Sequence, residues 1–579
     1  MIADQQTQTL PTDDSGLMQL ASFLGARDVA DFAATLLDVL RRVEKRYAGL
    51  FEEAPELGES GGNLVFTGAD DDPGTLETLT RLGFKNPSTV AAQVRAWHHG
   101  RYRSMRSSRA RELLTELMPA LLAALGGAPD PEAAFLNFDR FMSRLPAGVQ
   151  LFSLFHANPH LLVLVSEIMG GAPRLADRLS TRPGLLDVVL AESLWTEPPD
   201  AAAYAREIGA ALSQARDFQD VLDVVRRWKN EREFQIGVQL LRGRLAPGRA
   251  GEALADIADT ALIALKPAVE SEFRRLHGVI PDGQFAIVAL GKLGSREMTA
   301  TSDLDLLLLY DAPDDHALST GEKKLPVPQF YLRLATRFVN AVTAMTPEGL
   351  LYEVDTRLRP SGTKGPIATN LGGFRRYHAE DAWTWEHMTL TRGRVVAADA
   401  KLRARIEDAI REVLTRPRDA ASLIAEVSDM RQRMLRERKS DGPWDLKNRR
   451  GGLVDIEFVV QTLLLRHGAE HPEILSSSTA GALEAIARAG LLSPGDAAIL
   501  RDAYALTSGA QSVLRMTIDG VFEPEKLQPA LLAGLARAIG AVDFTTLEAT
   551  LERTCARAHE VFERLIPAEA AEAAASRSA

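Results

Sequence analysis

The chain has 579 residues, of which 46% are hydrophobic and 25% are charged, and its formal net charge is -11. This length predicts several globular units with cores of their own, and the composition excludes a fibrous or wholly disordered protein. Basic residues are spread along an acidic chain, so nucleic acid is a poor candidate partner.

Cysteine content and apolar runs bear on the compartment. The single cysteine, Cys555, cannot form an internal disulfide and has no neighbours at metal-ligand spacing. No apolar run approaches the roughly 20 residues that span a bilayer, and the polar start from Met1 to Asp14 lacks the pattern of a signal peptide. The sequence therefore predicts a cytoplasmic protein with no membrane partner.

The first half of the chain is predicted to be helical. Apolar residues recur at helical spacing from Leu17 to Arg46, and a break rich in Pro, Gly and Asp follows from Ala54 to Pro73. A junction at Gly126 to Pro131 precedes helical stretches that reach about Arg275. We predict a helical linker or regulatory region over residues 1–130.

Three short segments then predict strands. Phe285 to Leu290 and Leu304 to Tyr310 are continuous apolar runs, and Gly349 to Leu358 alternates apolar with charged residues. Helical periodicity returns after about Lys401. The predicted fold class is α+β and mostly α-helical, with a small mixed sheet in a domain over residues 131–400 and a C-terminal helical domain over 401–579.

The chemistry-bearing residues begin at the sequence Gly-Lys-Leu-Gly-Ser, residues 291–295. We predict that Gly294 and Ser295 follow a strand and open a helix, where free backbone N–H groups favour a phosphate. Asp303 and Asp305 stand two apart on the next strand, so their carboxylates share one face. Two hard-oxygen carboxylates beside phosphate oxygens are a typical magnesium environment, so the sequence predicts a site for Mg²⁺ and a nucleoside triphosphate.

A third acid, which would bind metal and complete a two-metal clamp, is predicted on the neighbouring strand. Asp355 is our choice, but Glu353 shares its strand face, and spacing alone does not decide between them. Arg357 and Arg359 follow at the same period, where a guanidinium would neutralise a leaving pyrophosphate, and Lys364 is a further candidate from the loop.

This pattern resembles the nucleotidyltransferase superfamily that includes DNA polymerase beta, and longer matches resemble one family within it, glutamine synthetase adenylyltransferase. The matches cover nearly the whole chain and are clearest in four stretches: residues 291–305 (Gly-Lys-Leu-Gly-Ser to Asp-Leu-Asp), 351–366 (with Val-Asp-Thr-Arg-Leu-Arg-Pro-Ser-Gly), 382–388, and 444–458 (with Gly-Gly-Leu-Val-Asp-Ile-Glu-Phe). The resemblance implies a polymerase-beta-like domain flanked by helical domains. Ser295 stands where this family commonly has glycine, although the wider superfamily uses serine there.

The resemblance also implies an activity and its partners. Members transfer AMP from ATP to a tyrosine hydroxyl of glutamine synthetase with Mg²⁺, and glutamine and the PII signal protein regulate them. The family usually has two nucleotidyltransferase halves, one attaching AMP and one removing it by phosphorolysis. The sequence Glu-Met-Thr-Ala-Thr-Ser resembles the carboxyl-terminal half, which attaches AMP. We therefore expect the chain to be a fragment that lacks the phosphorolytic deadenylylase half, and the resemblance assigns catalysis to Asp303, Asp305 and Asp355.

Two alternatives stay open. The first is a nucleotidyltransferase that acts on the PII protein or on nucleic acid, and the second is a regulatory binding module with a vestigial site. Asp455 and Glu457 form another Asp-x-Glu pair, but they lie in a stretch of helical period without a phosphate turn before it, so we interpret them as helix residues outside catalysis.

Overall fold

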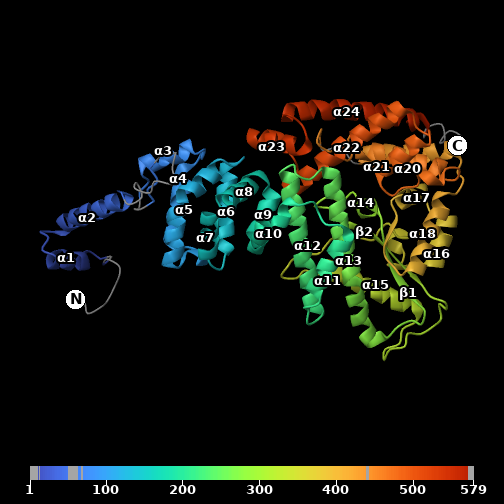
Figure 1. Ribbon diagram of the computed structural model, residues 1–579, viewed down its shortest axis with the longest axis horizontal. Coiled ribbons are helices and arrows are strands. Elements are labelled where there is room, and N and C mark those ends of the chain that lie inside the picture. Colours follow the sequence, from blue (N-terminus) through green and yellow to red (C-terminus); the bar gives the residue numbers. More distant parts are fainter. Residues whose placement is uncertain (1–10, 12, 50–62, 67–69, 438–441, 571–579) are drawn as a thin grey trace. The chain divides into compact units, whose positions relative to one another are not determined.

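The computed structural model describes residues 11, 13–49, 63–66, 70–437 and 442–570. Most of the break predicted over 54–73 lies outside the described residues. The chain divides into two compact units, residues 1–170 and 171–579. Figure 1 shows that helices dominate both units and that the strands lie in the second. The predicted α+β, mostly helical fold class with a small mixed sheet is confirmed.

The first unit is built from helices with local start signals. Asp130 accepts a hydrogen bond from the Ala133 N–H at 3.0 Å, and Pro131 occupies the first turn of its helix. Trp97 stacks on Phe135 with ring centroids 5.1 Å apart in the core. The helices of this unit are α1 (Asp14–Phe23), α2 (Val29–Gly49), α3 (Pro73–Arg81), α4 (Pro87–His98), α5 (Ser108–Gly126), α6 (Pro131–Arg144), α7 (Val149–Ala157) and α8 (Pro159–Gly171).

The second unit carries a five-stranded sheet between two groups of helices. Before the sheet come α9 (Pro173–Thr181), α10 (Leu186–Leu190), α11 (Ala201–Leu212), α12 (Phe218–Leu241) and α13 (Pro247–His277). The sheet region comprises β1 (Gln284–Ala289), α14 (Gly291–Gly294), β2 (Leu304–Asp311), α15 (Val327–Thr343), β3 (Val354–Asp355), β4 (Ala368–Asn370), α16 (Leu371–Glu380), α17 (Thr384–Leu390) and β5 (Arg394–Ala397). After it come α18 (Ala400–Leu414), α19 (Ala420–Glu437), α20 (Leu453–His467), α21 (Thr479–Arg488), α22 (Pro494–Thr517), α23 (Pro529–Ile539) and α24 (Phe544–Leu565).

The sheet is mixed, with strand order β3-β2-β1-β5 and β4 beside β2. β1 is antiparallel to both β2 and β5, whereas β2 runs parallel to β3 and to β4. The strands predicted at 285–290 and 304–310 are confirmed as β1 and β2. The strand predicted over Gly349 to Leu358 was wrong in extent, because only Val354 and Asp355 pair.

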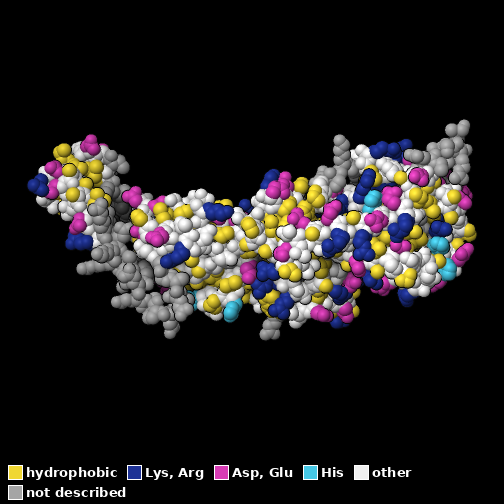
Figure 2. Space-filling view, turned by 90° about the horizontal axis from the view of Figure 1, so that it is seen from above, with side chains coloured by type: hydrophobic (Ala, Val, Ile, Leu, Met, Phe, Trp, Pro, Cys, Tyr) yellow, Lys and Arg dark blue, Asp and Glu magenta, His cyan; other side chains and the backbone are white. Residues whose placement is uncertain are grey.

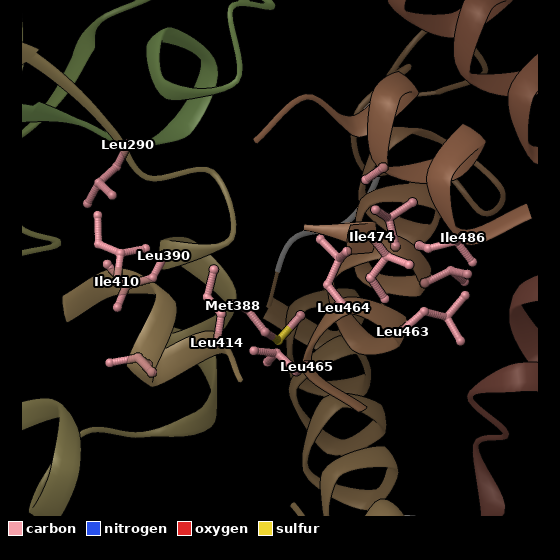
Figure 3. Close-up of a cluster of buried hydrophobic side chains, with 14 of the residues drawn as sticks. Leu290, Met388, Leu390, Ile410, Leu414, Leu463, Leu464, Leu465, Ile474 and Ile486 are labelled. Carbon is pink, nitrogen blue, oxygen red and sulfur yellow. The ribbon is translucent and has the colours of Figure 1, made fainter. Parts of the chain in front are cut away.

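Each face of the sheet is covered by a different set of helices. On one face, Phe285 and Tyr310 contact Tyr331 of α15, and the two tyrosine rings stack at 4.4 Å. On the other face, Leu307 and Leu309 of β2 share a core with α16, α17, α18, α20, α21, α22 and α24. Figure 3 shows part of this core, with Leu390 and Ile410 beside Leu290. The helices after the sheet are therefore fixed to it by one continuous apolar core.

The surface and the helix lengths add two observations. Figure 2 shows basic and acidic side chains intermixed on the face it draws. Among the described helices, none alone is long and apolar enough to cross a membrane, although two bent pairs, 149–171 and 529–565, meet the length and composition together.

Candidate active site

The predicted carboxylates meet at the start of two parallel strands. β2 and β3 pair so that Leu304 lies opposite Val354 and Asp305 lies opposite Asp355. Asp305 alternates with Leu304 and Leu306, so it faces the same side as Leu307, toward the helices that follow the sheet. The Leu304 N–H donates to the Glu353 carbonyl at 2.9 Å, which aligns the two strand starts. The structure thus places Asp355 beside Asp305, as the spacing predicted.

Asp305 is the electrostatically strained member of this group. Burial, together with the charges of Asp303 and Asp355, raises its pKa to about 6, against the opposing effects of Lys447 and Arg392. Like charges held close together cannot all ionise without a compensating cation. The charged Asp305 therefore destabilises the fold of the protein when no cation is bound.

Replacing Asp305 by Asn should stabilise the metal-free protein. The folded-state pKa of about 6 exceeds the ordinary aspartate value of 3.8, so the charged carboxylate destabilises the fold increasingly as pH rises between these two values, and fully above pH 6. We expect Asp305→Asn to raise the free energy of unfolding by about 1–3 kcal/mol near pH 8 in EDTA, and by less near pH 4.5. Urea denaturation at the two pH values measures this difference.

The matched control is Glu322→Gln, which removes an exposed acid without a described partner and should change stability by less than about 0.5 kcal/mol. Added Mg²⁺ should stabilise the wild type and not Asp305→Asn, because only the wild type retains both carboxylates. Equal stability of wild type and Asp305→Asn near pH 8 would contradict the strain described above.

Asp355 is engaged by Arg357. The Arg357 backbone N–H donates to Asp355 Oδ1 at 2.8 Å, and the guanidinium Nε lies 2.8 Å from Oδ2. These hydrogen bonds lower the pKa of the Asp355 carboxyl below its ordinary value. The Asp355 side chain is 13% exposed, whereas Glu353 lies on the surface. Burial and strand register therefore favour Asp355 over Glu353 as the third acid.

The donor chemistry fits a magnesium ion at Asp303 and Asp305. Both supply hard carboxylate oxygens, Asp305 from β2 and the exposed Asp303 from the position just before that strand, and Mg²⁺ is commonly bound through one or two carboxylates plus substrate phosphates. Among the described residues, no three carboxylate, thiolate or imidazole groups are gathered closely enough to hold a metal together. Both Asp355 oxygens accept hydrogen bonds from Arg357 instead. A metal role for Asp355 therefore stays a prediction.

The glycine turn differs from the prediction. Gly294 and Ser295 do not open a helix; α14 begins at Gly291, and these two residues end it. The cause is Gly291, which lies two residues after the end of β1 with φ +53° and starts the turn early. The buried Ser295 hydroxyl donates to the Gly291 carbonyl at 3.1 Å, so it closes the turn rather than facing solvent.

Gly291 and Gly294 lie so close to neighbouring atoms that a side chain at either position would clash. A Cβ at Gly291 would lie 2.0 Å from Asp305 Oδ2, and a Cβ at Gly294 would lie 2.0 Å from the Arg392 carbonyl oxygen. The turn thus presses directly against the carboxylate at position 305. This contact places the backbone of the Gly-Lys-Leu-Gly sequence beside the acidic site.

Arg394 holds the end of the turn from β5. Its guanidinium donates to the Leu293 carbonyl at 2.9 Å and to the Gly294 carbonyl at 3.2 Å. It also forms a two-pronged ion pair with Asp259 of α13, at 2.7 and 3.0 Å. Sequence reasoning missed Arg394 and Asp259, which act through contacts between distant parts of the chain.

The other predicted cations lie in the loop after β3. Arg359 donates to the carbonyls of Gly365 at 3.0 Å and Thr356 at 2.7 Å, so it ties the loop together. Lys364 ends a short 3₁₀ turn and is exposed. Arg357 pairs with Asp355 as described above. The arginines predicted to face phosphates are thus occupied by protein groups in this structure.

A second missed group links the turn to the helices after the sheet. Arg392 is buried and pairs with Glu457 of α20 at 2.8 Å and with Glu297 at 3.6 Å. Glu297 in turn accepts from the Thr479 N–H of α21 at 2.7 Å. Glu457 therefore has a structural role beside the site. The interpretation of Asp455 as a helix residue agrees with its burial in an ion pair with Arg431 at 2.5 Å.

Two family models and several curated proteins match this chain. The family model described as glutamate-ammonia ligase adenylyltransferase matches residues 162–409, and the one described as GlnD PII-uridylyltransferase matches 421–566. A protein named bifunctional glutamine synthetase adenylyltransferase/adenylyl-removing enzyme from Mesorhizobium japonicum is 44% identical over 98% of this chain and 57% of its own length.

Two further relatives carry the same name. The Rhizobium meliloti protein is 43% identical over 98% of this chain and 58% of its own length, and the Brucella melitensis protein is 47% identical over 80% and 47%. The chain thus spans a little over half the length of the first of these curated relatives. On these matches, nearly the whole of this chain is similar to part of the bifunctional glutamine synthetase adenylyltransferase/adenylyl-removing enzymes.

Proposed function

We propose that this chain transfers AMP from ATP to a tyrosine hydroxyl of glutamine synthetase and so down-regulates that enzyme in nitrogen control. The observation that carries the proposal is the register of Asp305 against Asp355, directly beside the backbone of the Gly291 turn. Carboxylates next to a backbone turn suit the transfer of a nucleotidyl group from a triphosphate. The names of the relatives support glutamine synthetase as the acceptor.

In the proposed reaction, the tyrosine oxygen attacks the α-phosphorus of ATP in line with the departing pyrophosphate. Asp303 and Asp305 would hold Mg²⁺, which would neutralise charge on the phosphate oxygens. A phenol has a reference pKa of about 10, so it must lose its proton during attack, and we assign the proton to Asp355.

Arg357 bears on the proposed role of Asp355. While its hydrogen bonds keep the pKa of Asp355 low, that carboxylate is a weak base. Arg357 is largely exposed, at 74%, so its side chain is free to turn toward phosphate oxygens. Transfer of Arg357 to the nucleotide would strengthen Asp355 as a base at the moment when ATP is bound.

Regulators and compartment follow from the family resemblance. We propose that glutamine and the PII signal protein regulate the chain, that the cytoplasm is its location, and that neither a membrane nor nucleic acid is its partner. The phosphorolytic activity of the family is proposed to reside outside these 579 residues. The intermixed surface charges of Figure 2 accord with a protein partner.

The test is incubation of the full chain with magnesium, ATP labelled at the α-phosphate, and purified glutamine synthetase. We expect the label on glutamine synthetase, at a single tyrosine identified by mass spectrometry. Omission of magnesium, or ATP labelled at the γ-phosphate, should leave the protein unlabelled. Unlabelled glutamine synthetase under conditions where the chain is folded and binds ATP would overturn the acceptor assignment.

One specific observation supports a second acceptor. Residues 421–566 match the model described as GlnD PII-uridylyltransferase. The same assay should therefore include the PII protein as acceptor and labelled UTP as donor. Labelling of PII instead of glutamine synthetase would replace the acceptor and leave the nucleotidyl-transfer chemistry intact.

A further inference from the structure

The glycine turn carries one lysine. Lys292, in α14, is directed into the protein, where its ammonium donates to the side-chain oxygen of Gln511 on α22. Burial lowers its pKa to about 8, and the neighbouring charges of Lys447, Arg392 and Arg515 act in the same direction, against Glu457. No described carboxylate forms an ion pair with Lys292. The Lys292 ammonium is therefore held by an amide oxygen rather than by an acid.

Lys447 lies in the segment that leads into α20, and its backbone is firmly held. Its carbonyl accepts from the Val454 N–H at 3.0 Å. The carbonyl of Asn448 accepts from Arg431 at 3.0 Å, and Arg431 is itself paired with the buried Asp455. Asp455 also accepts from the Gly451 N–H at 2.6 Å. This network gives the segment a fixed course.

The Lys447 side chain is nevertheless exposed and unengaged. No hydrogen bond or ion pair joins its ammonium to another part of the chain that the structure describes. A lysine on an anchored backbone, with a mobile four-carbon stem and no partner, is suited to meet an anion that arrives from solution.

The anchored segment lies on the side of the carboxylates. One turn beyond Val454, Glu457 pairs with Arg392 at 2.8 Å, and the carbonyl of Arg392 packs against Gly294. α20 also shares its core with Leu307, on the sheet face that carries Asp305. The positive charge of Lys447 acts on the carboxyl of Asp305, where it opposes the rise in pKa.

We infer that Lys447 binds the β- and γ-phosphates of the nucleotide, so that the helical region after the sheet completes the nucleotide site. This inference rests on the proposed function. In the transfer, the tyrosine oxygen bonds to the α-phosphorus, the bond to the bridging oxygen breaks, and that oxygen keeps the electron pair. The Lys447 ammonium neutralises charge that develops on the leaving pyrophosphate.

The test compares ligands that carry or lack these phosphates, in the full chain by calorimetry with magnesium. Lys447→Gln should weaken the binding of ATP and of pyrophosphate about tenfold or more, and leave AMP unchanged, because AMP has no β- or γ-phosphate. Lys447→Arg should retain most of the affinity, since it keeps the charge. Lys401→Gln, at an exposed lysine of α18, is the matched control and should change nothing.

The outcomes separate this inference from the proposed function. Equal ATP and pyrophosphate affinities in Lys447→Gln and Lys401→Gln would overturn the inference, as would an equal loss of AMP binding. Failure of the wild type to bind ATP would overturn the proposed function as well. A wild type that binds ATP, loses affinity through Lys447→Gln, and labels no glutamine synthetase would support this site and refute only the acceptor.

Discussion

Joint replacement of Asp303 and Asp305 by Asn is expected to abolish AMP transfer, by at least about 10³-fold, while the protein stays folded. A carboxamide keeps the shape of the side chain and removes the negative charge that would hold Mg²⁺. The loss should appear in the rate with every acceptor, because the damage lies at the nucleotide and not at the docking of a partner. Single-turnover labelling with α-labelled ATP measures it.

The matched control is Asp314→Asn with Asp315→Asn, which removes the same charge from exposed positions after β2. That pair should retain normal transfer. Circular dichroism and thermal melting should show that both double variants are folded, with the Asp303/Asp305 variant at least as stable as the wild type in EDTA, because its charge repulsion is gone. Near-normal turnover in that folded variant would refute the assignment of the two carboxylates.

The sheet shows which parts of the fold local sequence can predict. β1 and β2 are buried on both faces, so each is a continuous apolar run with clear boundaries. β4 and β5 have only three and four residues, too short for a periodicity to stand out, and sequence analysis did not predict them.

The segment before β3 was mispredicted because tertiary contacts override its alternation. Arg226 of α12 donates to the Gly349 carbonyl at 3.0 Å and to the Ala344 carbonyl at 2.7 Å, and Asn230 donates to the Glu348 carbonyl at 3.1 Å. Backbone groups held by side chains are not available for a strand ladder. An alternating pattern cannot reveal a helix more than a hundred residues away that takes these carbonyls.

In the candidate site, too, some residues can be predicted from local sequence and others depend on tertiary contacts. Spacing on neighbouring strands was enough to place Asp305 beside Asp355, because strand alternation and parallel register are local rules. The groups that hold the turn, Arg394 and Asp259, lie 135 positions apart, and only the fold brings them together. The helix start at Gly291 likewise depends on close packing that a Gly-Ser pattern does not specify.

Replacement of Asp355 should separate the third acid from its neighbour Glu353. Asp355→Asn is expected to reduce turnover by at least roughly 10²-fold with ATP binding little changed, because a carboxamide cannot take the phenol proton. Glu353→Gln should have a much smaller effect, since Glu353 is exposed and its part in the strand pairing comes from its backbone carbonyl. Transfer rates and ATP affinities of the two variants, measured side by side, test this difference.

Asp355→Asn removes two things at once, the proposed base and the ion pair between Asp355 and Arg357. A variant of Arg357 separates the two effects. Arg357→Gln removes the same ion pair and keeps the Asp355 carboxylate, whose pKa should then rise toward its ordinary value. If Asp355 acts as a base, Asp355→Asn should be far slower than Arg357→Gln at saturating ATP. If the ion pair alone mattered, the two variants would be equally slow. A severe Glu353→Gln with a mild Asp355→Asn would exchange the two acids, while Asp303 and Asp305 would keep their assignment.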